Sequence, residues 1–194
     1  VHGYEEYGVD FPKYLNGMFA IALHDTKKNK IMLVRDHIGI KPLFYSFNQN
    51  RIVFGSEIKA LLESKLVDRS LNMNALGDFL SWEYIPGEQT LFGTINKLEP
   101  GKYLEIDLNN PKCEPKEYWD IPLFNGNLPK LSEEEWIEKI DWQIKKSTKM
   151  QMISDVPLGA FLSGGVDSSL IVASMGDAQT FSIGFDDPTY NELN

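Results

Sequence analysis

The stretch 158–173, LGAFLSGGVDSSLIVA, constrains the fold of this chain more than any other part of the sequence. Its apolar run ends at Leu162 and has the length of a strand that is buried on both faces. Gly164 and Gly165 follow, and residues without a Cβ let backbone or a ligand approach closely. The next residues favour a helix, whose free N–H groups and positive end would point at one spot. The stretch therefore predicts an anion-binding turn between a buried strand and a helix.

The residue types around this turn indicate a nucleotide with a bridging metal ion. No Lys follows the glycines, which excludes the Walker loop, and the G-x-G-x-x-G spacing of dinucleotide folds is missing. The hydroxyls of Ser163, Ser168 and Ser169 are suited to phosphate oxygens. Asp167 would repel a bare phosphate, so it requires a divalent cation such as Mg²⁺ in between. The alternative is structural: Asp167 and its neighbouring serines cap a helix, and the glycines only turn the chain.

The string 163–168, SGGVDS, resembles the S-G-G-x-D-S signature of PP-loop ATP pyrophosphatases, which split ATP between its α and β phosphates. The flanking segments 153–159 and 181–185 are similar to those of glutamine-hydrolysing asparagine synthetases. This resemblance implies an α/β PP-loop adenine-nucleotide domain with a parallel sheet, ATP as a substrate and Mg²⁺ as a cofactor. It also implies that a glutaminase domain comes first in the chain.

Composition argues against membrane and nucleic-acid partners. The net charge of the 194 residues is −9, which disfavours nucleic acid, and no apolar run approaches the roughly 20 residues of a membrane helix. The single cysteine, Cys113, excludes an internal disulfide and suits a reducing cytoplasm. Because the chain begins at Val1 rather than Met and ends soon after a strand-like segment, we expect a piece of a longer cytoplasmic protein.

Residues 1–120 predict a sheet-rich α+β unit. The apolar patterns predict strands at 14–25, 31–35, 42–45 and 51–54. They also predict a hairpin at 94–108 that turns at Pro100-Gly101. Helices are expected at 56–62, capped by Ser56, and at 73–82, with an apolar face of Ala75, Leu76, Phe79 and Leu80.

Part of this unit resembles the later half of class II glutamine amidotransferase domains, in the segments 17–20, 35–43 and 56–61. The resemblance implies an N-terminal-nucleophile (Ntn) hydrolase fold, with two sheets between helices. That family's nucleophile is a cysteine at the mature N-terminus, whereas this chain begins with Val1. Nothing around Cys113 suggests a lowered thiol pKa, so we interpret it as structural or as part of a linker. We therefore expect no catalytic residue in this chain and assign the glutaminase chemistry to the longer protein.

Arg35 and Asp36 allow two interpretations. They could line an ammonia route or a domain contact, or they could be structural, with the arginine paired to a buried carboxylate and ordering the turn 39–42. We favour the structural interpretation, because isolated charge pairs seldom mark chemistry. Metal-like spacing is missing among the histidines, which argues against zinc: His2, His24 and His37.

A Pro- and Asn-rich stretch, 109–131, predicts a domain boundary. The expected bounds are 1–120 for the amidotransferase part, 121–130 for a linker and 131–194 for the synthetase part. Ser132 begins a capping box for a helix that ends near Met150. The expected buried face of this helix consists of Trp136, Ile137, Ile140 and Ile144. A strand at 179–185 should pair in parallel with the strand before the glycine turn, through a right-handed crossover.

The resemblance also implies roles for individual residues. The backbone around Leu162 and Ile183 would hold the adenine of ATP, and Asp167 would hold Mg²⁺ through the pyrophosphate. The residues that would cradle the pyrophosphate are Ser163, Gly164, Gly165 and Ser168. The implied reaction is adenylation of aspartate to β-aspartyl-AMP, then displacement of AMP by ammonia from glutamine. Asp186-Asp187 could be a second metal site, but we favour a polar turn before Pro188.

Other functions fit the same sequence. The protein could be an amidotransferase that acts on another carboxylate acceptor, such as a cell-surface sugar acid or a β-lactam precursor, or a non-catalytic nucleotide-binding remnant. The implied partners are the small molecules aspartate, glutamine and ATP, without nucleic acid or membrane, and a homodimer is suggested for the full-length protein. For the 194-residue chain itself we expect weak ATP binding at best and no synthesis.

Overall fold

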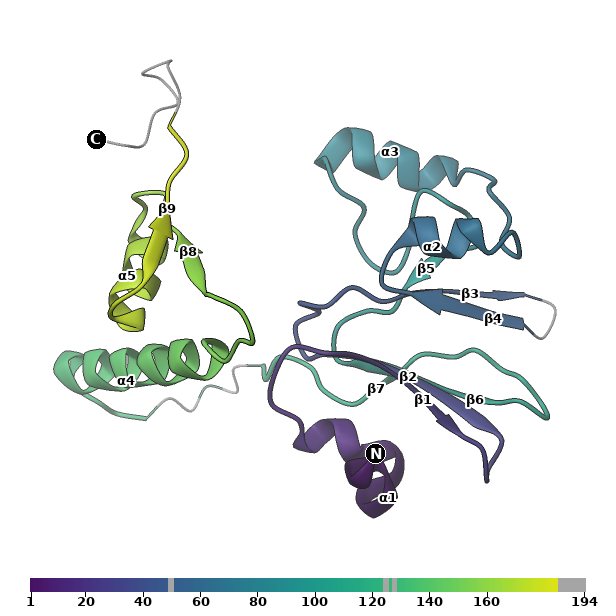
Figure 1. The fold of residues 1–194 in the computed structure, drawn as a ribbon, viewed down its shortest axis with the longest axis horizontal. Helices are drawn as coiled ribbons and strands as arrows, with labels where there is room; N and C mark the ends of the chain where they lie inside the picture. The colour runs from purple at the N-terminus through teal and green to yellow at the C-terminus, as the bar shows by residue number, and fades with distance from the viewer. Residues whose placement is uncertain (49–50, 124–125, 127–128, 185–194) are drawn as a thin grey trace. The chain divides into compact units, whose positions relative to one another are not determined.

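The computed structural model describes residues 1–48, 51–123, 126 and 129–184, and the chain divides into two compact units, 1–123 and 124–194 (Figure 1). None of the helices within the described ranges combines the length and the apolar character needed to cross a membrane. The expected domain bounds and the linker at 121–130 stay predictions, and part of that linker lies outside the described residues.

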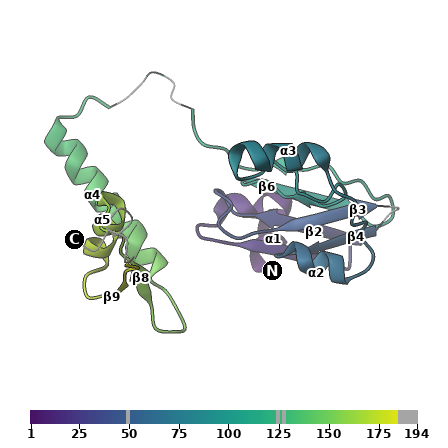
Figure 2. The same cartoon turned by 90° about the horizontal axis from the view of Figure 1, so that it is seen from above.

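The first unit contains these elements in chain order: α1 (His2–Tyr7), η1 (Gly8–Tyr14), β1 (Ala20–Asp25), β2 (Lys30–Arg35), β3 (Phe44–Asn48), β4 (Arg51–Gly55), α2 (Ile58–Glu63), α3 (Met73–Trp82), β5 (Asn96–Lys97), β6 (Lys102–Asp107) and β7 (Lys116–Glu117). The strands form two antiparallel sheets, in the orders β1-β2-β6-β7 and β4-β3-β5. Figures 1 and 2 show the two sheets stacked, with α1 outside one sheet and α2 outside the other. This arrangement confirms the predicted α+β unit with two sheets between helices.

Each interface between these layers holds its own hydrophobic cluster. Leu33, Leu104 and Tyr45 belong to the cluster between the sheets, to which both sheets contribute. Met32 and Val34 lie on the opposite face of β2, where they pack with Phe11 and other residues of α1 and η1. A third cluster joins α2 to the outer face of β3 and β4. Residues 31–34 of β2 are therefore all apolar, because the strand is covered on both faces and flanked by strands on both edges.

The predicted strand at 14–25 is wrong in its first part. Residues 8–14 form the 3-10 helix η1, and the strand begins only at Ala20. Leu15 and Phe19 are apolar because they pack into the cluster around Phe11 from a loop, without belonging to a ladder. Because β1 is an edge strand, Ala22 and His24 are exposed on it.

The predicted hairpin at 94–108 is also wrong. Strand β5 pairs with β3, through Phe44 and Lys97, whereas β6 pairs with β2. The turn at Pro100-Gly101 therefore carries the chain from one sheet to the other. A proline-glycine turn between two apolar segments looks the same in sequence whether the segments pair with each other or with different sheets.

Both predicted helices of this unit are present, but the buried face predicted for α3 and the cap predicted for α2 need correction. Helix α3 has the predicted bounds, and the Asn72 side chain accepts hydrogen bonds from the N–H groups of Asn74 and Ala75. Of its predicted apolar face only Ala75 is fully buried, while Leu80 is 75% exposed. Helix α2 begins after Glu57 without a side-chain cap, so the predicted cap at Ser56 is wrong.

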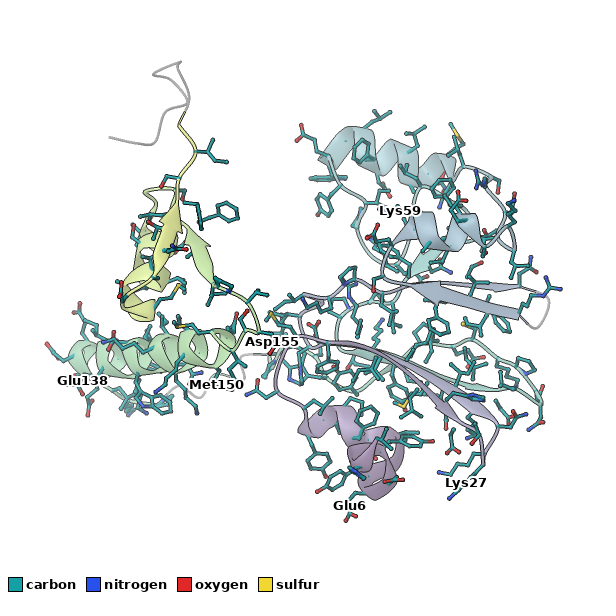
Figure 3. The ribbon with its side chains drawn as sticks, in the orientation of Figure 1. Glu6, Lys27, Lys59, Glu138, Met150 and Asp155 are labelled. Carbon is teal, nitrogen blue, oxygen red and sulfur yellow. The ribbon has the colours of Figure 1, made fainter. Side chains whose placement is uncertain are left out.

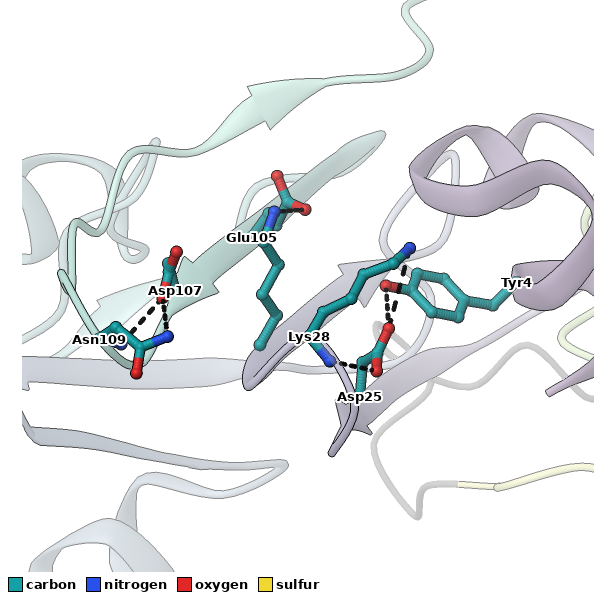
Figure 4. Close-up of polar contacts among 7 residues, drawn as sticks. Tyr4, Asp25, Lys28, Glu105, Asp107 and Asn109 are labelled. Carbon is teal, nitrogen blue, oxygen red and sulfur yellow. Dashed lines mark hydrogen bonds and ion pairs between the residues drawn. The ribbon is translucent and has the colours of Figure 1, made fainter.

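Polar contacts fasten α1 to the turn between β1 and β2 (Figure 4). The Tyr4 hydroxyl donates to Asp25 at 3.0 Å, and the other oxygen of Asp25 accepts from the N–H groups of Lys27 and Lys28. Burial and the neighbouring Asp25 carboxylate raise the pKa of Tyr4. Charged side chains such as Glu6 and Lys27 project away from the sheets (Figure 3). Charged side chains therefore lie on the outer surface of this unit, while its hydrophobic clusters lie between the layers.

The second unit consists of α4 (Glu133–Gln151), β8 (Gly159–Phe161), α5 (Val166–Met175) and β9 (Gln179–Phe181). The capping box is confirmed: Ser132 Oγ accepts from the Glu135 N–H, and the Glu135 carboxylate accepts from the Ser132 N–H. Strands β8 and β9 pair in parallel, as predicted, and α4 packs against α5 (Figures 1 and 2). The handedness of the crossover stays a prediction.

Several burial predictions for this unit are wrong. Strand β8 is not buried on both faces, since Phe161 is 79% exposed, and β9 ends at Phe181 rather than continuing toward Phe185, which lies outside the described residues. Ile137 and Ile140 of α4 are also exposed. Two short strands and two helices leave one side of each element without a covering layer among the described residues.

Candidate functional site

The predicted anion-binding turn connects β8 to α5, and glycine conformation shapes it. Gly164 has φ +82°. This left-handed conformation is energetically unfavourable for any residue that has a Cβ atom. Gly165 is extended, with φ −70° and ψ 158°, and is the N-cap of α5. The predicted capping role of Asp167 and its neighbouring serines is therefore wrong, because these residues lie inside the helix, beginning two positions after the N-cap. The two glycines therefore let the chain turn from the end of β8 into the start of α5.

Hydroxyl groups from both sides of the turn meet above Gly165. Ser163 Oγ and Ser168 Oγ lie 3.1 Å apart, and the Ser168 hydroxyl also contacts the Gly165 carbonyl at 3.1 Å. The first helical bond of α5 runs from the Ser169 N–H to Gly165. Within the described ranges, the preceding N–H groups of the helix have no side-chain cap. Free N–H groups at a helix start, together with hydroxyls, are suited to phosphate oxygens.

Asp167 lies in the first turn of α5 and is exposed to solvent. Among the residues that the structure describes, no group of three or more His, Cys, Asp or Glu side chains could hold a metal ion by itself. A lone carboxylate of this kind fits Mg²⁺, which commonly binds through one or two carboxylates together with substrate phosphates and water. The donor set therefore suits a metal that arrives with a phosphate ligand.

The two residues predicted to lie near adenine are brought close by the parallel strands. The Leu162 N–H donates to the Phe181 carbonyl at 2.9 Å, and the Ser182 hydroxyl donates to the Leu162 carbonyl at 2.6 Å. Ile183 follows directly and its side chain is 67% exposed. Ser182 was not predicted as part of the site, because a serine beside a strand end has no pattern of its own. Asp186 and Asp187 lie outside the described residues.

A hollow of about 300 Å³ lies elsewhere in this unit, between α4, β8 and α5. Its lining is largely apolar and includes Ile144, Leu158 and Ile171. It contains none of the predicted site residues. Polar side chains such as Ser147 and Thr148 also border it, but the apolar share of its lining is larger, which suits apolar contacts.

Arg35 and Asp36 have the structural role that we favoured, but not as an ion pair. The Arg35 guanidinium donates to the carbonyls of Gly39, Lys41 and Leu98, at 2.7 to 3.0 Å. The Asp36 carboxylate accepts from backbone N–H groups instead. The two side chains therefore order the turn 39–41 by bonding its backbone from both sides.

Cys113 is structural. It packs against the hydrophobic cluster between the two sheets, and burial raises the pKa of its thiol to about 11. A thiol with a raised pKa is a poor nucleophile at neutral pH, because the thiolate is the reactive form.

We therefore expect Cys113 to react with an aromatic disulfide reagent about 100-fold more slowly at pH 8 in the folded chain than in the unfolded chain. The rate should keep rising with pH beyond 9, since the pKa lies above this range. Stopped-flow absorbance of the released thiolate measures both rates. A rate that levels off below pH 9 would contradict the structural role.

Two family models match this chain, one in each of its two compact units, 1–123 and 124–194. Residues 1–119 match the family model described as "Glutamine amidotransferase domain", and residues 139–194 match the model described as "Asparagine synthase". Asparagine synthetase [glutamine-hydrolyzing] 2 of Bacillus subtilis is 39% identical over 194 residues, covering 94% of this chain and 26% of that protein. A Methanocaldococcus jannaschii protein, provisionally named asparagine synthetase [glutamine-hydrolyzing] 2, is 35% identical over 191 residues, covering 94% of this chain and 36% of that protein.

Asparagine synthetase [glutamine-hydrolyzing] 1 of Bacillus subtilis is 32% identical over 195 residues, covering 98% of this chain and 30% of that protein. The chain thus spans between about a quarter and just over a third of the relatives that it matches. The longer of the two model matches covers more than half of the chain. Through residues 1–119 the chain belongs to the glutamine amidotransferase domain family, and in this sequence that domain is joined to a segment that matches asparagine synthase.

Proposed function

We propose that the full-length protein carries out glutamine-dependent asparagine synthesis and that the turn between β8 and α5 binds the triphosphate of ATP. One observation carries the proposal: the uncapped start of α5, with its Ser163–Ser168 hydroxyl pair, lies in the segment that matches asparagine synthase, after an amidotransferase domain. The longer helices α3 and α4 both begin with side-chain caps. A ligand anion would supply for α5 what Asn72 and Ser132 supply there.

In this proposal the residues of the turn orient the phosphates. Ser163, Ser168 and the N–H groups around Gly164 and Gly165 would bind the oxygens of the β and γ phosphates. Asp167 would hold Mg²⁺, which offsets negative charge on the departing pyrophosphate. The β-carboxylate of aspartate would then attack the α phosphorus, and the bond from the α phosphorus to the bridging oxygen would break. Adenylation makes the carboxyl group reactive toward ammonia, which displaces AMP.

The amidotransferase unit would support the release of ammonia from glutamine. Its scaffold is present here, but its only cysteine is the half-buried Cys113. We therefore propose that the nucleophile and the aspartate pocket belong to regions of the longer relatives that the 194-residue chain does not match. Glutamine, aspartate and ATP as substrates, Mg²⁺ as cofactor and a homodimeric, cytoplasmic enzyme complete the proposal.

Exchange of labelled pyrophosphate into ATP by the full-length protein tests the proposal, because adenylation is reversible. We expect exchange to require aspartate, and we expect Asp167→Asn to lower it about 100-fold through loss of the metal-bound carboxylate. Asp177→Asn is the matched control, since Asp177 is an exposed carboxylate of the same unit, after α5. Exchange that needs a carboxylic acid other than aspartate would identify another acceptor. No exchange with any acceptor would indicate a non-catalytic nucleotide-binding protein.

A further inference from the structure

The hydrogen-bond ladder between the parallel strands β8 and β9 ends beside the turn that connects β8 to α5. The ladder pairs Gly159 with Gln179, Ala160 with Thr180 and Phe161 with Phe181. It extends one step further, because the Leu162 N–H donates to the Phe181 carbonyl. In a parallel ladder of this register, the next bond would run from the Ile183 N–H to the Leu162 carbonyl.

The Ser182 side chain occupies the place of that bond. Its hydroxyl donates to the Leu162 carbonyl at 2.6 Å, which is a short and well-formed hydrogen bond. Within the described part of the chain, the Leu162 carbonyl accepts no backbone N–H, and the Ile183 N–H has no acceptor. The hydroxyl thus satisfies the Leu162 carbonyl, just after β8, and leaves the Ile183 N–H as a backbone donor beyond the end of β9.

The position of this donor suits a ligand. Ligands of parallel sheets bind beyond the carboxyl ends of the strands, and Ile183 is exposed there, close to the turn that begins at Ser163. Gly184 follows without a side chain, so it does not shield the Ile183 backbone. A purine with an unprotonated ring nitrogen would accept the N–H, while its phosphates lie over the glycine turn.

We propose that Ser182 is a positioning residue for the nucleotide base: its hydroxyl replaces the ladder donor at Leu162 and keeps the Ile183 N–H available for N1 of adenine. This inference rests on the proposed function, because it assumes that ATP binds at the turn. Without the hydroxyl, the Leu162 carbonyl captures the Ile183 N–H and the base loses its donor. A net hydrogen bond of this kind corresponds to about a fivefold change in affinity, or roughly 1 kcal/mol.

Comparison of ATP with inosine triphosphate separates this role from a merely structural one. N1 of adenine accepts a hydrogen bond, whereas N1 of hypoxanthine carries a hydrogen and would face the Ile183 N–H as a second donor. Titrations of the 194-residue chain with each nucleotide and Mg²⁺, followed by ligand-observed NMR, detect weak binding. We expect the wild-type chain to prefer ATP, and Ser182→Ala to weaken ATP about fivefold with little change for inosine triphosphate.

Ser182→Thr keeps a hydroxyl and should keep the preference for ATP. Ser174→Ala is the matched control, since the Ser174 hydroxyl also donates to a backbone carbonyl, that of Leu170 within α5. Circular dichroism of each variant checks that the unit stays folded. Equal weakening of both nucleotides by Ser182→Ala, or an unchanged preference, would overturn the inference while leaving ATP binding in place. If the full-length protein, titrated in the same way, binds neither nucleotide, the proposed phosphate site is overturned together with the inference.

Discussion

Gly101→Ala is expected to lower the melting temperature of the amidotransferase unit by more than 10 °C, the largest effect of any single methyl group that we foresee. Gly101 has φ +66°, and a Cβ built on it would lie 2.1 Å from the carbonyl oxygen of Trp119. That carbonyl has little freedom to move, because the N–H groups of Tyr118 and Trp119 both donate to the Gly101 carbonyl. Left-handed strain and the clash together should cost about 4 kcal/mol.

Gly87→Ala separates strain from clash. Gly87 has φ +65°, almost the same as Gly101, but a Cβ there would meet nothing within 4 Å. It should therefore cost only about 1 kcal/mol, the left-handed penalty alone. Thermal unfolding followed by near-ultraviolet circular dichroism compares the two variants. If both melt within two or three degrees of each other, the close approach of Trp119 to Gly101 is wrong.

Asp36→Asn is expected to destabilise the same unit by about 3 kcal/mol at pH 7, since it weakens several hydrogen bonds to a buried charged acceptor. Asp36 is 1% exposed, and its carboxylate accepts from the N–H groups of Ile40 and Lys41 at 2.9 Å and of Phe19 at 3.3 Å. An asparagine amide has one acceptor oxygen, so its NH₂ group would face a backbone donor. Chemical denaturation at pH 7 measures the loss.

The pH dependence of this effect has a definite sign. Burial raises the pKa of Asp36, but the backbone N–H groups of Lys41, Ile40 and Phe19 more than compensate, so the pKa lies below its ordinary value. The carboxylate therefore stabilises the fold above the unfolded-state pKa of about 4, and this stabilisation is lost as the pH falls through the lower folded-state value. The difference between wild type and Asp36→Asn should shrink over that window.

Asp68→Asn is the control for these measurements. Asp68 is exposed, and its side-chain carboxylate accepts hydrogen bonds from the hydroxyl and N–H of the nearby Ser70. Its replacement should cost less than about 1 kcal/mol, as for most surface substitutions. A similar loss for Asp36→Asn and Asp68→Asn would contradict the role of Asp36 in ordering the turn 39–41.

The surroundings of Gly101 and of Asp36 show why part of the fold could not be predicted from the sequence. The turn at Pro100-Gly101 was identified, but not the sheets that it connects. The Gly101 N–H donates to the Asp36 carbonyl at 3.0 Å, and Arg35 reaches the Leu98 carbonyl, across more than 60 positions in the chain. A pattern of neighbouring residues contains no information about such distant partners. Arg35 was accordingly expected to pair with a buried carboxylate, whereas its guanidinium bonds backbone carbonyls.

The candidate site shows the same division. The turn, its glycines and the helix after them were predicted correctly in type, because the string SGGVDS specifies them locally. The N-cap was misplaced by two residues, since Asp and Ser inside a first turn resemble cap residues. Ser182 was missed altogether, because its role depends on the pairing of β8 with β9.

The sequence by itself determined the elements whose causes lie within a few residues. Examples are α3, α4 with its capping box, the apolar residues 31–34 of β2 and the bend at Gly164. Their hydrogen bonds join near neighbours, so composition and spacing are sufficient to predict them. Only the tertiary structure decided which strands share a sheet and which carbonyl each of Arg35 and Ser182 bonds. Those choices depend on burying apolar faces against distant segments and on satisfying the polar groups that burial removes from water.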